Sequence, residues 1–261
     1  GISHEACSLA GTWNLGKLIC IYDDNGISID GKIDGWFTDD TAARFKSYGW
    51  HVIDKVDGHD ADAISSAIDE AIKNTNNPTL ICCKTQIGFG SPNKAGTASS
   101  HGAPLGEDEI KKTKEKLGWE HEAFEIPQDI REMWDGSKKG EKLEKSWVEL
   151  FDNYSKHYPD LAEEFSRRIN RVLPENWEEI SKNAINEINH EAIDLATRQS
   201  SLLSLNKLGD SLPEMIGGSA DLTGSNLTKH DTSVVIDETN SDGNYIYYGV
   251  REFGMAAVGN G

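Results

Sequence analysis

Positive charge is scarce in this sequence. Its 261 residues include 26 Lys and Arg against 44 Asp and Glu, which leaves a formal net charge of -18. So acidic a surface repels nucleic acid and anionic membranes, and no local cluster of Lys or Arg overrides that average. The composition therefore predicts no nucleic-acid partner and no membrane partner, and a phosphorylated ligand would need a local basic pocket.

Long apolar runs are also absent. No run approaches the roughly 18 consecutive apolar residues that a membrane helix needs, and no signal-peptide pattern opens the chain. The sequence begins with Gly1 instead of Met and stops at Gly261 without a natural end. We therefore expect an internal piece of a longer protein.

Cysteine is rare. The four cysteines are Cys7, Cys20, Cys82 and Cys83; they show no C-x-x-C spacing, and three of them fall in apolar strand patterns. This usage favours reduced core thiols over disulfides or a zinc site, and it predicts a cytoplasmic protein.

The residues that are present have a globular composition, with 37% hydrophobic and 27% charged side chains. Strand and helix patterns alternate through the first third of the chain, which predicts an α/β fold with a doubly wound parallel sheet. We expect strands at residues 17–22, 50–56 and 79–84, and helices at 2–12, 38–49 and from 60 onward. Thr38 and Asp60 are the expected helix caps, and the apolar run 18–21 predicts a strand covered on both faces.

The pattern becomes helical and acidic from residue 107 to residue 173. Apolar side chains repeat there at helical spacing and are expected to be core residues: Trp147, Leu150, Phe151, Tyr154, Leu161, Phe165 and Ile169. The alternation of strands and helices stops around residues 159–174, so we place a boundary there. Residues 1–160 would form one domain, and residues 161–261 a helical connector followed by the start of a second domain.

Oxygen-bearing side chains follow the first predicted strand, in residues 23–31 (DDNGISIDG). Ligands bind at the carboxyl ends of strands in open α/β sheets, and an Asn amide oxygen with a main-chain carbonyl two residues on would suit Mg²⁺. A hairpin turn at Asn25-Gly26 would explain the same residues without a metal. An EF-hand loop does not fit, because Ile27 occupies a ligand position and Ser28 replaces the required Gly.

Residues 85–108 form a long loop rich in Gly and polar side chains, which predicts a lid or a binding loop. Its segment 88–93 (GFGSPN) only half matches a dinucleotide-binding fingerprint, because Asn93 stands where the third Gly belongs. A Rossmann-type site is therefore disfavoured.

Five motifs, in order along the chain, resemble those of the transketolase family. They are residues 1–11 (GISHEACSLAG) running into 23–31, then 84–97 (KTQIGFGSPNKAGT), 100–106 (SHGAPLG), 217–222 (GGSADL) and 245–255 (YIYYGVREFGM). The Gly-Asp-Gly that opens the cofactor motif of that family is absent, since the chain begins just after the place where it should sit.

The resemblance implies a thiamine-diphosphate-binding fold and a cofactor held together with Mg²⁺ or Ca²⁺. Asn25 and the carbonyl of Ile27 would hold the metal and the diphosphate, and Ile87 and Asp221 would also lie against the cofactor. Glu252 would hydrogen-bond the pyrimidine and drive its tautomerisation, for which partial burial must raise the pKa of this carboxyl.

The resemblance also implies substrate contacts. His101 would touch both cofactor and substrate and relay protons, while Arg198 and Ser225 would bind the sugar phosphate. Outside the motifs each residue has a plainer explanation: His101 as an exposed loop side chain, Arg198 as a helix-surface charge, and Glu252 as a first-turn acid on a helix dipole.

The implied reaction transfers a two-carbon ketol unit from a ketose phosphate to an aldose phosphate through a thiamine-diphosphate carbanion, in the pentose phosphate pathway. The family's site lies between two subunits of a homodimer, so Asn25 and Glu252 of one chain would serve different sites. Two alternatives stay open: a related enzyme that makes deoxyxylulose phosphate or dihydroxyacetone, and a non-catalytic scaffold paralogue.

Overall fold

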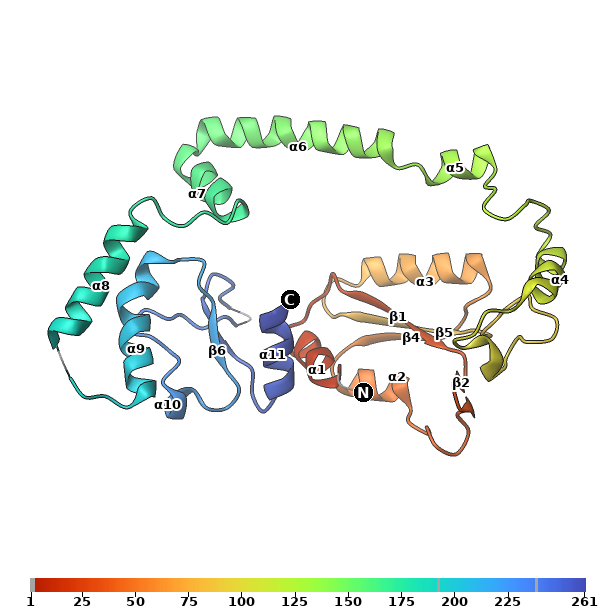
Figure 1. Cartoon of the computed structure of the whole chain (residues 1–261), viewed down its shortest axis with the longest axis horizontal. Helices are drawn as coiled ribbons and strands as arrows, with labels where there is room; N and C mark the ends of the chain where they lie inside the picture. The colour runs from red at the N-terminus through yellow and green to blue at the C-terminus, as the bar shows by residue number, and fades with distance from the viewer. Residues whose placement is uncertain (1–2, 192, 238) are drawn as a thin grey trace. The chain divides into compact units, whose positions relative to one another are not determined.

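A computed structural model describes residues 3–191, 193–237 and 239–261 (Figure 1). The chain divides into two compact units, residues 1–125 and residues 126–261, and each is described by itself. The helix predicted over residues 2–12 is observed as α1 (His4–Thr12), and Ile2 lies outside the described residues.

The first unit is built on a parallel sheet with the strand order β1-β5-β4. Both β1 (Ile19–Asp24) and β4 (His51–Asp57) pair with the central strand β5 (Thr79–Lys84). The last residues of the three strands align, because Asp24 and Asp57 both pair with Lys84. The carboxyl ends of all three strands therefore share one edge.

Helices cover both faces of this sheet. On one face Leu80 and Cys82 of β5 pack into a core with Ala10 and Trp50, near α1 and α2 (Thr41–Ser47). On the opposite face Ile81 and Cys83 pack with Ala67 and Ala71 of α3 (Ala61–Lys73), which lies across the sheet from α1 and α2 (Figure 1). The doubly wound parallel sheet that the sequence predicts is thus confirmed.

The prediction that the first strand is covered on both faces is wrong for this chain. Ile21 is 59% exposed and Leu18 is 37% exposed. The reason is the strand order, since β1 lies at the end of the sheet and only β5 lies between two neighbours. The cores retain Cys20 and Tyr22 on one face and Ile19 on the other.

One of the two predicted helix caps is also wrong. Asp40 caps α2 by accepting a hydrogen bond from the Ala43 amide at 2.8 Å, so the cap lies two residues after Thr38. Asp60 caps α3 as predicted, with its carboxylate accepting from the amides of Asp62 and Ala63.

The Asn25-Gly26 turn does not close a hairpin onto the first strand. β2 (Ile27–Ser28) pairs antiparallel with β3 (Gly31–Lys32), so the chain reverses at residues 29–30. The hairpin explanation of Asn25 is thereby removed. The unit ends with the long loop, the short helix η1 (Ala98–Ser100) within it, and α4 (Glu107–Leu117).

The second unit is mostly helical before its two short strands. In chain order it contains α5 (Gln128–Trp134), α6 (Ser137–His157), α7 (Pro159–Ile169), α8 (Trp177–Glu191), α9 (Thr197–Leu208), η2 (Gly209–Ser211), β6 (Gly217–Ser219), α10 (Thr223–Asn226), β7 (Tyr245–Tyr247) and α11 (Glu252–Asn260). The strands β6 and β7 pair in parallel.

The aromatic residues of α6 and α7 are not a buried core. Trp147 is 53% exposed and Phe165 is 41% exposed, although both lie within a series of ring contacts between the two helices. Phe151 connects the series, with its ring centroid 5.9 Å from that of Trp147 and 5.5 Å from that of Phe165. The two helices pack against each other through these rings, which leaves one side of the aromatic series open to solvent.

No helix among the described residues is long and apolar enough to cross a lipid bilayer.

Candidate functional site

The carboxyl ends of β1 and β5 are joined by side chains. The Thr85 hydroxyl donates a hydrogen bond to the Asp23 carboxylate, and the Thr85 amide donates to the carbonyl of Asp24 at 3.4 Å. The Lys84 ammonium pairs with the Asp24 carboxylate, and this hydrogen bond raises the pKa of Lys84. The turn after β1 and the loop after β5 therefore leave the sheet as neighbours.

Asn25 is oriented by its own turn. Its Nδ2 donates to Asp23 Oδ2 at 3.3 Å, and its Oδ1 accepts from the Ile27 amide at 3.0 Å. This orientation pairs each donor with an acceptor, whereas the flipped amide would set Nδ2 against the Ile27 N–H. Gly26 completes the turn with a φ of +69°, a conformation that suits Gly.

The residues at this turn offer few ligands for a hard cation. In the part of the chain that the structure describes, no group of three or more His, Cys, Asp or Glu is arranged to hold a metal ion. A cation here would depend on amide and main-chain oxygens and on oxygens of a bound ligand. Asn25 Oδ1 suits that role, because one of its two lone pairs remains after it accepts the Ile27 amide.

The end of β4 holds the beginning of the long loop. The Gly58 amide donates to the carbonyl of Lys84 at 2.8 Å, and His59 Nε2 accepts from the Gln86 amide at 2.8 Å. The His59 ring also stacks on Phe89, with centroids 3.9 Å apart and an interplanar angle of 13°. A Cβ on Gly58 would lie 2.4 Å from Thr85 Cγ2, so this approach needs Gly.

The middle of the loop is held by Glu109 of α4, which is only 7% exposed. Its Oε1 accepts from the Ser91 hydroxyl and from the Asn93 amide at 2.7 Å, and its Oε2 accepts from Asn93 Nδ2 at 2.8 Å. These hydrogen bonds, with that of Ser91 the largest cause, lower the pKa of Glu109 to about 2. The carboxylate is therefore ionised at neutral pH.

Two further bonds fix the loop internally. Lys94 Nζ donates to the carbonyl of Leu105 at 2.8 Å, and the Gly96 amide donates to the carbonyl of Ile87 at 2.8 Å. Ile87 is half-buried close to the sheet edge, while His101 is exposed between Lys94 and Leu105. The structure therefore brings Ile87 and His101 into one braced loop that begins beside Asn25.

The second unit repeats the arrangement at the ends of β6 and β7. Asp221 follows β6 with a φ of +59°, Ser225 lies in α10, and Glu252 is the first residue of α11 after β7. All three side chains are exposed. Since the two strands are parallel, Asp221 and Glu252 follow strand ends on the same edge.

The buried Tyr245 holds the segment around Ser225. Its hydroxyl is hydrogen-bonded to Thr223 Oγ1 at 2.9 Å and to Thr228 Oγ1 at 2.7 Å, and Tyr245 is 0% exposed. The first residue of α10 and Thr228, two residues beyond its end, are thus tied to one buried hydroxyl.

Arg198 is not brought to this edge by any contact among the described residues. It lies in the first turn of α9 and is exposed, and the hydrogen bonds and ion pairs of the described chain do not join its guanidinium to Asp221, Ser225 or Glu252. The relation of Asn25 in the first unit to Glu252 in the second stays a prediction.

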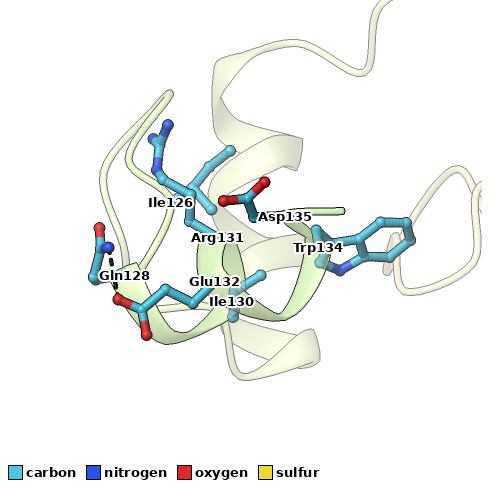
Figure 2. A pocket seen from close by; sticks show the side chains of 7 residues that line it. All are labelled: Ile126, Gln128, Ile130, Arg131, Glu132, Trp134 and Asp135. Carbon is cyan, nitrogen blue, oxygen red and sulfur yellow. Dashed lines mark hydrogen bonds between the residues drawn. The ribbon is translucent and has the colours of Figure 1, made fainter. Parts of the chain in front are cut away.

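A surface hollow beside α5 is lined by none of the candidate residues (Figure 2). Its walls include Ile126, Ile130 and Trp134, and Gln128 Nε2 donates to Glu132 Oε1 at 2.9 Å at its rim. Its lining comes from one short helix and the residues that flank it, so it does not gather groups from several elements as an active site does.

The sequence alone did not single out Thr85, His59 or Glu109, and it marked Asp23 only as one of the oxygen-bearing residues 23–31. A signal for Glu109 exists in the sequence, because Thr113 and Leu117 follow it at helical spacing, which aligns the acid with an apolar side chain. An acid in line with an apolar side chain on a helix is unusual enough to flag. Asp23 and Thr85 become partners only through the strand register, which the sequence does not reveal.

Comparison with known proteins gives two family matches. Residues 1–174 match the thiamine-diphosphate-binding domain of transketolase, and residues 194–261 match the transketolase pyrimidine-binding domain. Over all 261 residues the chain is 58% identical to transketolase 2 of Aliivibrio fischeri and 56% identical to transketolase 2 of Escherichia coli. In both cases it spans 39% of the relative's length.

Solved structures agree. A transketolase variant from Pichia stipitis in complex with fructose-6-phosphate is 43% identical with a TM-score of 0.88, over 100% of this chain and 39% of that chain. Transketolase from Leishmania mexicana is 35% identical with a TM-score of 0.87, over 99% of this chain and 38% of that chain. Together with two family models that match along most of the sequence, these likenesses show that the chain belongs to the transketolase family.

Proposed function

We propose that the protein carrying this chain is a transketolase, which moves a two-carbon ketol unit from a ketose phosphate to an aldose phosphate with thiamine diphosphate and Mg²⁺ or Ca²⁺. The observation that carries the proposal is the match to both cofactor-binding domains at 56–58% identity to curated transketolases. The geometry supports it, since candidate residues follow the carboxyl ends of parallel strands in each unit.

Bound thiamine diphosphate supplies a carbanion and an electron sink for cleaving and forming the bond beside the ketose carbonyl. Toward that group, Asn25 Oδ1 and the Ile27 carbonyl would hold the metal and diphosphate. Ile87 and Asp221 would line its rings. His101, exposed on the braced loop, would donate and accept protons at substrate oxygens.

Glu252 would hold the proton that the pyrimidine exchanges. In this chain its carboxylate is exposed at the start of α11, where it is in water and not in the low-dielectric site that such an exchange favours. We propose that a second subunit covers it, which makes the enzyme a homodimer whose site is completed across the interface.

The proposed substrates are sugar phosphates. Related transketolases from Pichia stipitis form complexes with fructose-6-phosphate and sedoheptulose-7-phosphate. In a chain of net charge -18 a phosphate needs a local cation, and exposed Arg198 with the hydroxyl of Ser225 would supply a charge-assisted site.

The wider setting of the proposal is the pentose phosphate pathway in the cytoplasm. The thiols agree with a reducing compartment, since all four cysteines are free, and burial together with Asp54 and Asp24 raises the pKa of Cys82 to about 11. We retain a boundary near residue 160 between the diphosphate-binding part and the connector leading to the pyrimidine-binding part.

The test is a coupled assay on the full-length protein with a ketose phosphate donor and an aldose phosphate acceptor, with and without thiamine diphosphate and Mg²⁺. Transfer that requires both additions supports the proposal. Activity only with pyruvate and a triose phosphate would identify a deoxyxylulose-phosphate enzyme, and ketol transfer only to formaldehyde would identify a dihydroxyacetone synthase. If none of the three assays shows activity, with or without the cofactor, the result would favour the scaffold paralogue.

Glu252→Gln sharpens the test, because it keeps the shape of the side chain and removes its ability to exchange a proton. We expect turnover to fall by roughly 10² to 10⁴ fold, the usual share of a positioned acid or base. Calorimetry should show cofactor binding within a few fold of the parent protein, since the diphosphate is anchored elsewhere. Turnover close to that of the parent would remove Glu252 from the mechanism.

A further inference from the structure

Glu109 combines burial, charge and a set of partners that all come from the long loop. It is 7% exposed, whereas its neighbours Glu107 and Asp108 in the same helical turn are exposed. Its three hydrogen-bond donors are the Ser91 hydroxyl and both the amide and the side chain of Asn93. A carboxylate removed from water needs such donors, so Glu109 and residues 91–93 depend on each other.

The contact at Glu109 is connected to the rest of the loop. Ser91 Oγ, which donates to Glu109, also accepts the Lys94 amide at 3.1 Å, and Lys94 Nζ reaches across to the Leu105 carbonyl. On the other side, the Ile87 carbonyl accepts the Gly96 amide at 2.8 Å. A shift of residues 91–94 therefore moves both the Ile87 end and the Leu105 end of the loop.

The loop is also packed tightly where it meets α4 and itself. A Cβ on Gly90 would lie 2.8 Å from Leu117 of α4, and a Cβ on Gly88 would lie 3.0 Å from Ser100 Oγ. Both glycines have positive φ, +89° at Gly90 and +66° at Gly88. The loop is thus held in one position against α4 by Glu109 and Leu117, and we call the loop in this position the seated loop.

We propose that Glu109 is a positioning residue: it fixes the loop of residues 85–106 against α4 and so preorganises Ile87 for the cofactor and His101 for the substrate. This inference rests on the function proposed above for those two residues. The hydrogen bonds of Glu109 go to Ser91 and Asn93, so it would act through the loop and not by contact with a ligand. Glu109 would affect catalysis by setting the fraction of molecules in which the loop is held against α4.

The proposal has a quantitative signature. If only a fraction of molecules has the loop seated, the apparent dissociation constant of any ligand that needs the seated loop rises by the inverse of that fraction. Cofactor and ketose phosphate would meet the same loop, so the Kd of the cofactor and the KM of the ketose phosphate, measured with the cofactor below saturation, should rise by the same factor. At saturation the ligands restore the seated loop, and kcat should change little.

The first experiment compares Glu109→Ala with Glu115→Ala in the full-length protein. Glu115 is the matched control, since it is a glutamate of the same helix and is exposed. For Glu109→Ala we expect the Kd of thiamine diphosphate to rise by about tenfold, and the KM of the ketose phosphate, measured with the cofactor held below its Kd, to rise with it. The kcat at saturation of both ligands should stay within about threefold. Hydrogen exchange should accelerate in residues 86–105 of the ligand-free protein and stay unchanged in Glu115→Ala.

A second pair of variants tests the contact while keeping side chains of similar size at positions 93 and 109. Asn93→Asp sets a carboxylate against Glu109 Oε2, where Asn93 Nδ2 now donates at 2.8 Å, and should unseat the loop through like-charge repulsion. Adding Glu109→Gln to that variant should restore it, because the Gln amide can donate to the introduced carboxylate while its oxygen still accepts from Ser91 and the main-chain amide of residue 93. Recovery of slow exchange and of both constants in the double variant supports the direct contact.

Three outcomes overturn the proposal. Unchanged exchange in residues 86–105 of Glu109→Ala and of Asn93→Asp would show that Glu109 does not seat the loop. Faster exchange with unchanged Kd and KM would make the contact merely structural, and so would a loss confined to kcat. If the parent protein binds thiamine diphosphate but fails to transfer ketol units, the proposed function fails, while the exchange and cofactor measurements still decide the role of Glu109.

Discussion

The Thr85 hydroxyl donates a hydrogen bond to the Asp23 carboxylate, which joins the residue after β5 to the penultimate residue of β1. The other oxygen of the same carboxylate accepts from Asn25 Nδ2 at 3.3 Å. Asp23 therefore transmits the position of one strand end to the amide proposed to hold the metal. A side chain without a direct role in binding can in this way set the direction of one that has it.

Asn25→Ala should raise the Mg²⁺ concentration and the thiamine diphosphate concentration needed for half-maximal activity, by about tenfold or more. The reason is that a small cation with few protein oxygens loses geometry when one is removed. Titration of the full-length protein with each component measures the effect, and Asn183→Ala, at an exposed position of α8, is the control. Superimposable titrations of Asn25→Ala and the parent would exclude Asn25 as a ligand.

Arg198→Ala should weaken phosphorylated donors much more than unphosphorylated ones. Loss of a charge-assisted contact corresponds to about 1.5–3 kcal/mol, or roughly one to two decades in kcat/KM. Hydroxypyruvate is a suitable unphosphorylated donor, and Arg131→Ala on α5 is a matched exposed control. An equal loss with both kinds of donor would assign Arg198 a structural role only.

Acid should release the loop through Glu109. The pKa of this carboxyl is lowered from 4.5 to about 2 by donors that exist only in the folded state, and nearby Lys112 adds to the effect. A lowered folded pKa means that the stabilisation is complete above pH 4.5 and is lost as the pH falls from about 4.5 to about 2. The protection of the amides of residues 91–94 from hydrogen exchange, taken relative to the intrinsic rate at each pH, should fall over that window in the parent. Glu109→Gln should lack this fall in protection.

Arg167→Ala should lower the melting temperature more than Arg168→Ala does. The Arg167 guanidinium donates to Glu164, to the carbonyl of Val172 and, through two nitrogens, to Glu214. Among the described residues, the ion pair of Arg168 is with Glu164. Removing Arg167 takes from Glu214 the hydrogen bond that is the largest cause of its lowered pKa. Scanning calorimetry of the two variants gives the comparison, and equal shifts would contradict the importance of the Glu214 contact.

Tyr245→Phe should raise the KM of phosphorylated donors while cofactor binding stays within a few fold. The buried hydroxyl holds Thr223 and Thr228 on either side of Ser225, and its removal leaves two hydroxyl partners unmatched. Unsatisfied buried groups cost about 1–3 kcal/mol, so a lower free energy of unfolding is also expected. Tyr247→Phe, at a half-exposed neighbour in the same strand, is the control. A loss of stability with unchanged KM would separate Tyr245 from substrate binding.

The sequence predicts best those features that depend only on residues within a single helix or strand. The bounds of β5 follow from an apolar run between Pro78 and Lys84, and Asp60 caps α3 through contacts within three residues. The exposure of Ile21 escaped prediction, because an apolar run does not reveal whether its strand is central or terminal in the sheet. The same holds for Trp147 and Phe165, whose spacing marks an apolar face but not what covers it.

The candidate site divides in the same way. Asn25 and His101 could be named from motifs, since their neighbours along the chain carry the pattern. Glu109 could not be named so directly, because its partners lie 16 and 18 residues away and meet it only after the loop folds back on α4. Residues that hold a site in place are set by tertiary contacts, which local sequence patterns do not encode.

The bond from Lys94 Nζ to the Leu105 carbonyl closes the base of residues 95–104. Within that segment the Gly96 amide donates to the Ile87 carbonyl and the Ser100 hydroxyl donates to the Lys94 carbonyl, whereas residues 102–104 are exposed. A change in the length of the loop is therefore tolerated best at residues 102–104, where it would displace His101 while the Ile87 end keeps its contacts.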